Sequence, residues 1–109
     1  MRRWSAEEEI LLSVKKGMSL ALLINELVTN AVKHGGKEVD LRLVGNENSV
    51  TLTVSDNGPG FSPAFDPFTS AHFGLEFVES VVHLELKGQL TYANNADGGA
   101  CITVTFPVP

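Results

Sequence analysis

The sequence lacks the features that define several large classes of protein. Its single cysteine, Cys101, excludes an internal disulfide and a cysteine-ligated metal cluster. The longest apolar run, residues 20–24, is too short to cross a bilayer, and the first residues lack the apolar core of a signal peptide. The net charge of −5 argues against a broad surface for nucleic acid or anionic membranes. We therefore expect a cytoplasmic domain that binds no nucleic acid and makes no direct membrane contact.

Length and composition indicate one globular domain over residues 1–109. The sequence is 43% hydrophobic and 19% charged, which is typical of a folded chain rather than a disordered one. A chain of this length has room for a single domain and buries roughly two-thirds of the surface that it exposes when unfolded.

The spacing of apolar residues predicts the secondary structure. Helices are expected over residues 18–33, with Ser19 as the cap and Gly35-Gly36 as the stop, and over residues 73–86. The apolar set of the second helix is Phe73, Phe77, Val78, Val81, Val82 and Leu84. Strands are expected at residues 39–43, 50–54, 89–93 and 101–106, with an edge strand at 10–14.

These strands alternate apolar with polar residues, which is the pattern of a sheet covered by helices on one face only. The predicted fold is α+β: a two-layer sandwich with a mixed, mostly antiparallel sheet. On the last strand, Cys101 shares the face of Thr103 and Thr105, where we expect it to be a packing residue.

Polar residues form a stripe on the first predicted helix. At 100° per residue, Glu26, Asn30 and Lys33 fall within about 60° of one another, and His34 continues the turn. A solvated helix face is one interpretation. A carboxylate and an amide one turn apart, beside Leu22 and Leu23, also suit a hydrated Mg²⁺ and a reacting group.

A second group follows the strand at 50–54, with the letters D-N-G-P-G-F at residues 56–61. Asn-Gly is a strong hairpin signal, but about 17 residues pass before the next regular element, which favours a binding loop. Glycines allow close approach of backbone to a ligand, and Asp56 at the strand end could accept a hydrogen bond from an exocyclic amine such as that of adenine.

The third group lies where the loop enters the second helix, at residues 70–75. A glycine near the first turn of a helix leaves backbone N–H groups available at the positive end of the dipole, which suits a phosphate. Many helices begin in the same way, so this group carries little weight alone.

Together the three groups, in this order, resemble the GHKL ATPase superfamily. Residues 25–35, N-E-L-V-T-N-A-V-K-H-G, are similar to its N-box, residues 56–61 to its D-x-G-x-G box, and residues 74–78, G-L-E-F-V, to its glycine box. The ending G-G-A-C-I-T-V-T-F-P at 98–107 is similar to its terminal strand. The N-box wording, the short lid with Phe65-Asp66-Pro67 and the Phe-Pro ending resemble the sensor histidine kinases.

The resemblance implies the Bergerat fold, with ATP and Mg²⁺ as ligands. It implies that Asn30 is the Mg²⁺ ligand, that Glu26 orients or polarises the acceptor, and that Lys33 and His34 lie beside the phosphates. It also implies adenine contacts by Asp56, with room for the ring at Gly58 and Gly60 and next to Phe61, and a phosphate seat at Gly74 and Leu75. The sequence departs from the family pattern at His72 and Ala100. His72 puts the phosphate contacts in doubt, and Ala100 lacks the hydroxyl expected near the adenine.

The activity implied is that of an ATP-dependent protein-histidine kinase in a two-component system. Its partners would be a phosphoacceptor domain of helical-hairpin form and, indirectly, a response regulator. No segment before residue 10 could form that hairpin, so we expect a fragment of a longer kinase that does not autophosphorylate alone. The isolated domain is expected to be a monomer, and the parent, which can be membrane-anchored, a homodimer.

Two alternative functions fit the same motifs. One is a free-standing anti-sigma-factor serine kinase, favoured by the short length of the chain. The other is a non-catalytic interaction module gated by nucleotide, to which His72 and Ala100 lend slight support, although Glu26 and Asn30 are intact.

Overall fold

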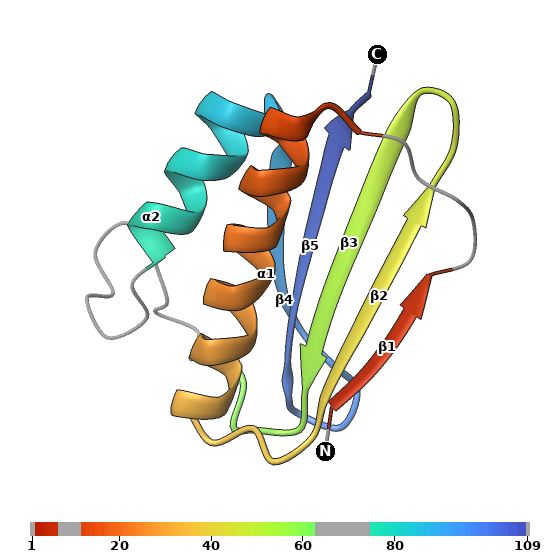
Figure 1. The fold of residues 1–109 in the computed structure, drawn as a ribbon. Coiled ribbons are helices and arrows are strands. Elements are labelled where there is room, and N and C mark those ends of the chain that lie inside the picture. Colours follow the sequence, from red (N-terminus) through yellow and green to blue (C-terminus); the bar gives the residue numbers. More distant parts are fainter. Residues whose placement is uncertain (1, 7–11, 63–74, 109) are drawn as a thin grey trace.

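The computed structural model describes residues 2–6, 12–62 and 75–108 (Figure 1). Five strands form one sheet in the order β1-β2-β3-β5-β4. Strands β1 and β2 are parallel, and every other neighbouring pair is antiparallel. The strands are β1 (Arg2–Ala6), β2 (Val39–Gly45), β3 (Ser49–Asp56), β4 (Gln89–Asn94) and β5 (Ala100–Pro107). The four sequence-predicted strands that follow the first helix are therefore confirmed.

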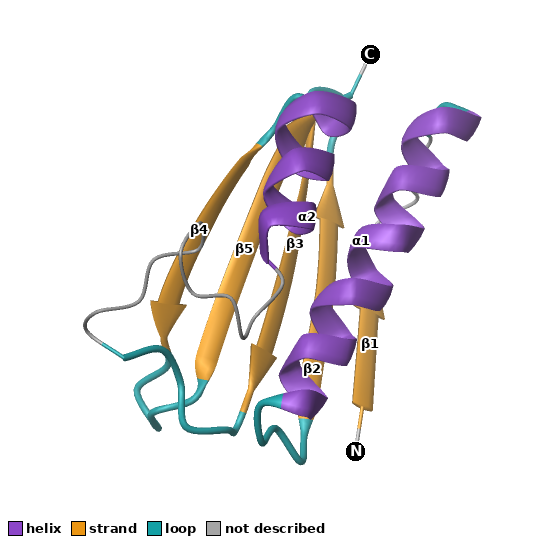
Figure 2. Ribbon diagram, turned by 90° about the vertical axis from the view of Figure 1, so that its left-hand side faces the viewer, coloured by secondary structure: helices purple, strands orange, loops and turns teal. Residues whose placement is uncertain are grey.

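The helices lie together on one face of the sheet (Figure 2). Helix α1 spans Val14–Lys33, and helix α2, Leu75–Ser80, continues directly into the π-helical segment η1, Val81–Leu86. The other face of the sheet carries no described helix. This arrangement confirms the two-layer α+β sandwich. None of the described helices is long and apolar enough to cross a membrane.

The hydrophobic core fills the space between the helices and the sheet. Alternate residues of β2 and β3 are buried, as the period of two requires. The core comprises Leu20, Leu23, Leu27, Ala31, Val39, Leu41, Leu43, Val50, Leu52, Val54, Leu75, Val78, Val81, Val82, Leu86, Ile102, Val104 and Phe106. Cys101 is half-buried on the opposite face, where its Sγ lies 3.4 Å from Ser55 Oγ.

The start of α1 differs from the sequence prediction. The helix begins at Val14, four residues early, because the side chain of Ser13 caps it by accepting a hydrogen bond from Lys16 N at 3.2 Å. Ser19 is instead a buried residue inside the helix. The predicted edge strand at 10–14 is wrong for its described part, because residues 12 and 13 form no strand and Val14 is helical, while residues 10 and 11 lie outside the described residues. The edge strand is β1.

The end of α1 agrees with the prediction, and a hairpin of β2 and β3 follows it. After Lys33 the chain turns through Gly35, whose φ of +98° favours glycine. Between β2 and β3, Asn46 Oδ1 accepts hydrogen bonds from Asn48 N at 2.7 Å and Ser49 N at 3.0 Å. An asparagine that bonds its own turn in this way fixes the hairpin.

Of the apolar set predicted for the second helix, Val78, Val81 and Val82 are buried as expected, and Phe73 lies outside the described residues. Phe77 and Leu84 are exposed, whereas Leu75, Val78 and Glu79 are buried. Positions 75, 78, 79 and 82 follow the helical spacing, so Phe77 falls on the far side. The π-helical turn of η1 then changes the period, which moves Leu84 outward. A glutamate at an inward position was not expected from the sequence.

We predict that two adjacent leucines of α1 differ sharply in their contribution to stability. Leu23 is fully buried, whereas Leu22 is 55% exposed. Leu23→Ala should lower the free energy of unfolding by about 2–5 kcal/mol because it leaves a cavity, and Leu22→Ala should change it by less than about 0.5 kcal/mol. Urea denaturation of both variants tests this. Equal losses would contradict the placement of α1 on the sheet.

Candidate functional site

A pocket lies at the end of β3, between α1 and the sheet. It is lined by three kinds of element: the last two turns of α1, the ends of β3 and β5, and the first residue of α2. The lining residues are Leu27, Asn30, Ala31, His34, Val54, Asp56, Gly60, Phe61, Leu75, Ala100 and Ile102. The structure therefore brings together Asn30, His34, Asp56, Gly60, Phe61 and Leu75, which the sequence proposed for one site.

Asp56 is the charged side chain in the pocket wall. It continues the inward face of β3 after Val54, so its carboxylate points toward the helices. Its Oδ1 accepts hydrogen bonds from Gly58 N at 2.8 Å and from Ala100 N at 3.3 Å. Among the described residues, none donates to Oδ2. One oxygen therefore fixes the side chain, and the other is available to a donor in the pocket.

Glycines allow the turns near Asp56 to pack closely against it and against one another. A Cβ on Gly99 would lie 1.9 Å from the backbone oxygen of Asp56, and one on Gly36 would lie 3.0 Å from its Cβ. Gly60 has a φ of +76°, and a Cβ there would lie 2.3 Å from Gly98 O. Only glycine fits these contacts without a shift of the backbone. The backbone oxygen of Asp56 also accepts a hydrogen bond from Asn95 Nδ2 at 3.2 Å.

The polar stripe of α1 lies only partly in the pocket wall. Asn30 lies at its edge, and its buried Nδ2 has no hydrogen-bond partner among the described residues. His34 caps the helix, donating its backbone N–H to Asn30 O at 3.0 Å, and also lines the pocket. Glu26, one turn before Asn30, is half-buried outside the lining, and Lys33 is exposed. The structure thus places two of the four residues directly in the pocket wall.

The remaining predicted residues are Gly58 and Gly74. Gly58 contacts the site through its hydrogen bond to Asp56 rather than by lining the pocket. Gly74, like His72, lies outside the described residues.

The pocket encloses about 30 Å³, far less than the several hundred Å³ of a typical ligand site. The enclosed volume therefore accommodates only part of a large ligand.

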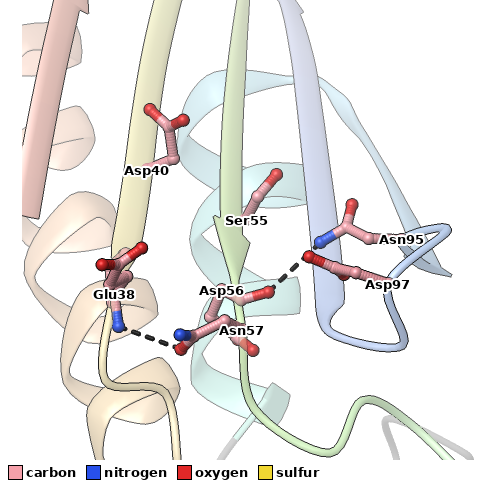
Figure 3. A pocket seen from close by; sticks show the side chains of 8 residues that line it. Glu38, Asp40, Ser55, Asp56, Asn57, Asn95 and Asp97 are labelled. Atoms are coloured by element: carbon pink, nitrogen blue, oxygen red, sulfur yellow. Dashed lines mark hydrogen bonds between the residues drawn. The ribbon is translucent and has the colours of Figure 1, made fainter.

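A second hollow lies on the open face of the sheet (Figure 3). Glu38, Asp40 and Asp97 give it three carboxylates, and no Lys or Arg of the described residues lines it. Asn57 closes its lower edge, where Oδ1 accepts hydrogen bonds from Lys37 N and Glu38 N at 2.8 and 2.9 Å. Such a hollow repels phosphate, so we assign the candidate site to the pocket on the helix side.

Several residues of the site escaped the sequence analysis. Asn95 and Gly99 hold the β4–β5 turn against Asp56, and Asn94 bonds the backbone of Phe61. The sequence N-N-A-D-G-G at 94–99 signals a turn, but a turn signal does not say which distant strand the turn packs against.

The family follows from a match that covers most of the chain. Residues 15–109 match the model described as "Histidine kinase-, DNA gyrase B-, and HSP90-like ATPase". The chain belongs to this ATPase family. All three motifs that suggested the resemblance lie inside the match, so the recognition of a GHKL domain is confirmed.

Relatives of this ATPase domain include sensor kinases. It is 34% identical over 108 residues to the C4-dicarboxylate transport sensor protein DctS of Rhodobacter capsulatus, covering 81% of this chain and 16% of DctS. It is 29% identical to the sensor histidine kinase component HK1 of Mycobacterium tuberculosis, covering 95% and 69%. The ATP-binding domain of PrrB from Mycobacterium tuberculosis superposes with a TM-score of 0.77 at 27% identity, covering 97% and 79%. The chain thus spans a small part of DctS.

We predict that two glycines of this ATPase domain respond oppositely to alanine. Gly99→Ala places a Cβ against the Asp56 backbone and should lower the free energy of unfolding by about 1–3 kcal/mol. Gly17→Ala, in α1, meets no atom within 4 Å and should raise it by about 0.5–1 kcal/mol, because alanine favours the helix. Chemical denaturation measures both. A Gly99→Ala variant as stable as the natural chain would contradict the close approach at Asp56.

Proposed function

We propose that this chain is the ATP-binding catalytic domain of a sensor histidine kinase, and that it transfers the γ-phosphate of ATP to a histidine on a separate helical-hairpin domain. The observation that carries the proposal is the Asp56 carboxylate, held by one oxygen in a mostly apolar pocket wall. The family match and the sensor-kinase relatives support the same activity.

In this proposal the adenine lies between α1 and the ends of β3 and β5. Oδ2 of Asp56 accepts a hydrogen bond from the exocyclic amine, while Val54, Ile102 and Leu27 provide apolar contacts to the ring. Gly60 and Phe61 form the opposite side, and Gly58 keeps the carboxylate oriented. Ala100 provides a backbone N–H to Asp56 and no hydroxyl, so specificity for adenine depends mainly on the carboxylate.

The triphosphate would lie past Asn30 toward the start of α2. Asn30 suits Mg²⁺ because its buried amide has an unsatisfied atom at the pocket edge, and rotation of the amide presents Oδ1 to a cation. Among the described residues, no group of three His, Cys, Asp or Glu could hold a metal ion. This agrees with a Mg²⁺ held mainly by phosphates and water, and such an ion would neutralise phosphate charge.

The remaining residues are assigned by their distance from this path. His34 and Lys33, at the end of α1, would flank the phosphates, and Gly74 with Leu75 would seat them at the start of α2. Glu26 lies one turn from Asn30 and outside the pocket lining, where it would orient or polarise the incoming histidine. Catalysis of this kind consists mainly of positioning and charge neutralisation.

The proposed acceptor is the helical hairpin of the parent kinase, with a response regulator receiving the phosphate afterwards. Residues 1–109 form one ATPase domain in this proposal, monomeric when isolated and dimeric only in the parent. The chain alone should incorporate no stable phosphate. His34 would flank the phosphates rather than approach from behind the γ-phosphorus, which in-line transfer requires.

We predict that Asp56→Asn abolishes nucleotide binding without unfolding the domain. Asparagine Oδ1 can still accept the bonds from Gly58 and Ala100, but its NH₂ group would face the adenine amine and leave donors unpaired, at roughly 1–3 kcal/mol for each. Calorimetry with Mg²⁺-ADP measures the affinity. Asp40→Asn, on the open face (Figure 3), is the matched control and should bind as the natural chain does. Unchanged affinity in Asp56→Asn would disprove the adenine assignment.

We predict that two residues of the α1 stripe separate metal-dependent binding from chemistry. Asn30→Ala should reduce the gain in nucleotide affinity that Mg²⁺ provides. Glu26→Gln should leave binding nearly intact and slow phosphoryl transfer, because an amide cannot accept the proton of the acceptor. If both weakened binding equally and both melted early, the stripe would be structural.

Transfer is measured with labelled ATP, Mg²⁺ and the hairpin domain of the parent. The expected label is stable in base and labile in acid, as a phosphohistidine is. Label on a serine of a partner protein, stable in acid and labile in alkali, would instead support the anti-sigma-factor kinase. Acid-labile label on the isolated 109 residues would contradict the division of roles between the two domains.

A further inference from the structure

Phe61, which lines the pocket, is hydrogen-bonded by one side chain to β4, an edge strand of the sheet. Asn94, the last residue of β4, accepts a hydrogen bond from Phe61 N at 2.7 Å through Oδ1 and donates one from Nδ2 to Phe61 O at 3.0 Å. A single amide therefore satisfies both backbone groups of Phe61. The fit is tight, because a Cβ on the neighbouring Gly60 would lie 2.8 Å from the same Oδ1.

The ring of Phe61 is held by the same strand. Tyr92 precedes Asn94 by two residues, so both side chains leave the same face of β4. The rings of Phe61 and Tyr92 meet edge to face, with centroids 5.8 Å apart and an interplanar angle of 86°. This geometry is favourable for an aromatic pair. Both the backbone and the side chain of Phe61 are thus positioned by β4.

Tyr92 is in turn fixed by the buried carboxylate of helix α2. Its hydroxyl donates to Glu79 Oε1 at 2.7 Å, and Glu79 Oε2 lies 2.6 Å from His83 Nε2. His83 Nδ1 faces Gly88 O at 3.1 Å and donates to it, so Nε2 donates to Glu79 Oε2 only when the imidazole carries a proton on both nitrogens. Burial, together with Glu79, raises the pKa of the Tyr92 hydroxyl, which therefore stays protonated and remains a donor. Both oxygens of the buried carboxylate are satisfied, as such a group requires.

We propose that Asn94 and Tyr92 are positioning residues of the nucleotide pocket: they hold Phe61 as its fixed wall, and Glu79 ties that wall to helix α2. Neither Asn94 nor Glu79 lines the pocket, so both act through Phe61. The wall and Leu75, which opens α2 four residues before Glu79, then keep one spacing across the pocket. This proposal rests on the proposed function, since it assigns a role in nucleotide binding.

The first test removes the two hydrogen bonds between the Asn94 side chain and the backbone of Phe61. Asn94→Ala should raise the Kd for Mg²⁺-ADP about tenfold. The reason is that the lost positioning of Phe61 should cost about as much binding free energy as one net hydrogen bond contributes. Asn46→Ala is the matched control. It likewise removes two hydrogen bonds between an asparagine side chain and the backbone, here from Asn48 N and Ser49 N at the opposite end of β3, and should lower thermal stability while leaving Kd unchanged. Calorimetry well below the melting temperature of each variant keeps every sample folded.

The second test examines whether the hydrogen bond between Glu79 of α2 and Tyr92 helps to position Phe61. Glu79→Gln retains an oxygen that accepts from Tyr92 and an amide that can pair with His83, so Kd should stay within about twofold of the natural value. Glu79→Leu removes both partners and should raise Kd about fivefold. Rescue by glutamine separates positioning from charge, and a role in stability alone would shift the melting temperature of Glu79→Leu without changing the Kd of the folded protein.

The outcomes distinguish this proposal from the proposed function. If the natural chain binds no nucleotide, the proposed function itself fails. If the natural chain binds Mg²⁺-ADP and Asp56→Asn does not, while Asn94→Ala binds as tightly as the natural chain or more tightly, the pocket is real and the positioning role of Asn94 is overturned. Equal Kd values for Glu79→Leu, Glu79→Gln and the natural chain would overturn the role of Glu79.

Discussion

The close packing of three turns on the last residue of β3 determines the geometry of the pocket. Gly99 touches the backbone of Asp56, Gly36 touches its Cβ, and Gly58 donates to its carboxylate. These turns belong to the end of α1, the loop after β3 and the start of β5, so segments more than sixty residues apart in sequence are held within contact distance of one carboxylate. Because Oδ1 accepts hydrogen bonds from two turns, the Asp56 carboxylate is held in one orientation in the pocket wall, as electrostatic recognition requires.

Much of the architecture could be predicted because the apolar pattern is regular where it is buried. The alternation in β2, β3 and β5 and the spacing of Leu20, Leu27 and Ala31 report directly which faces meet the core. The two-layer α+β sandwich follows from that pattern. The family motifs then identified Asn30, Asp56, Gly60 and Phe61, all of which line one pocket, although the chemical role of each stays a prediction.

The errors in the prediction have local physical causes. Lys15-Lys16-Gly17 suggested a break, but the cap at Ser13 starts the helix before them. Phe77 and Leu84 were expected in the core, and instead Glu79 is buried, because His83 and Tyr92, four and thirteen residues away, provide hydrogen-bond partners for its two oxygens. Long-range polar pairs of this kind leave no periodic signal in a sequence. The hydrogen bonds between Asn94 and Phe61 join residues 33 positions apart, and they could not be predicted from the sequence for the same reason.

The central claim is that Asp56 reads the exocyclic amine of adenine, and nucleobase discrimination tests it most directly. Inosine diphosphate carries a carbonyl oxygen where adenosine diphosphate carries the amine, so a fixed carboxylate oxygen would face an acceptor instead of a donor. Calorimetric titration of the natural chain with each nucleotide and Mg²⁺ should show ADP binding at least about tenfold more tightly than IDP, as expected when buried polar groups are left unpaired. Equal affinity for the two nucleotides would contradict the account.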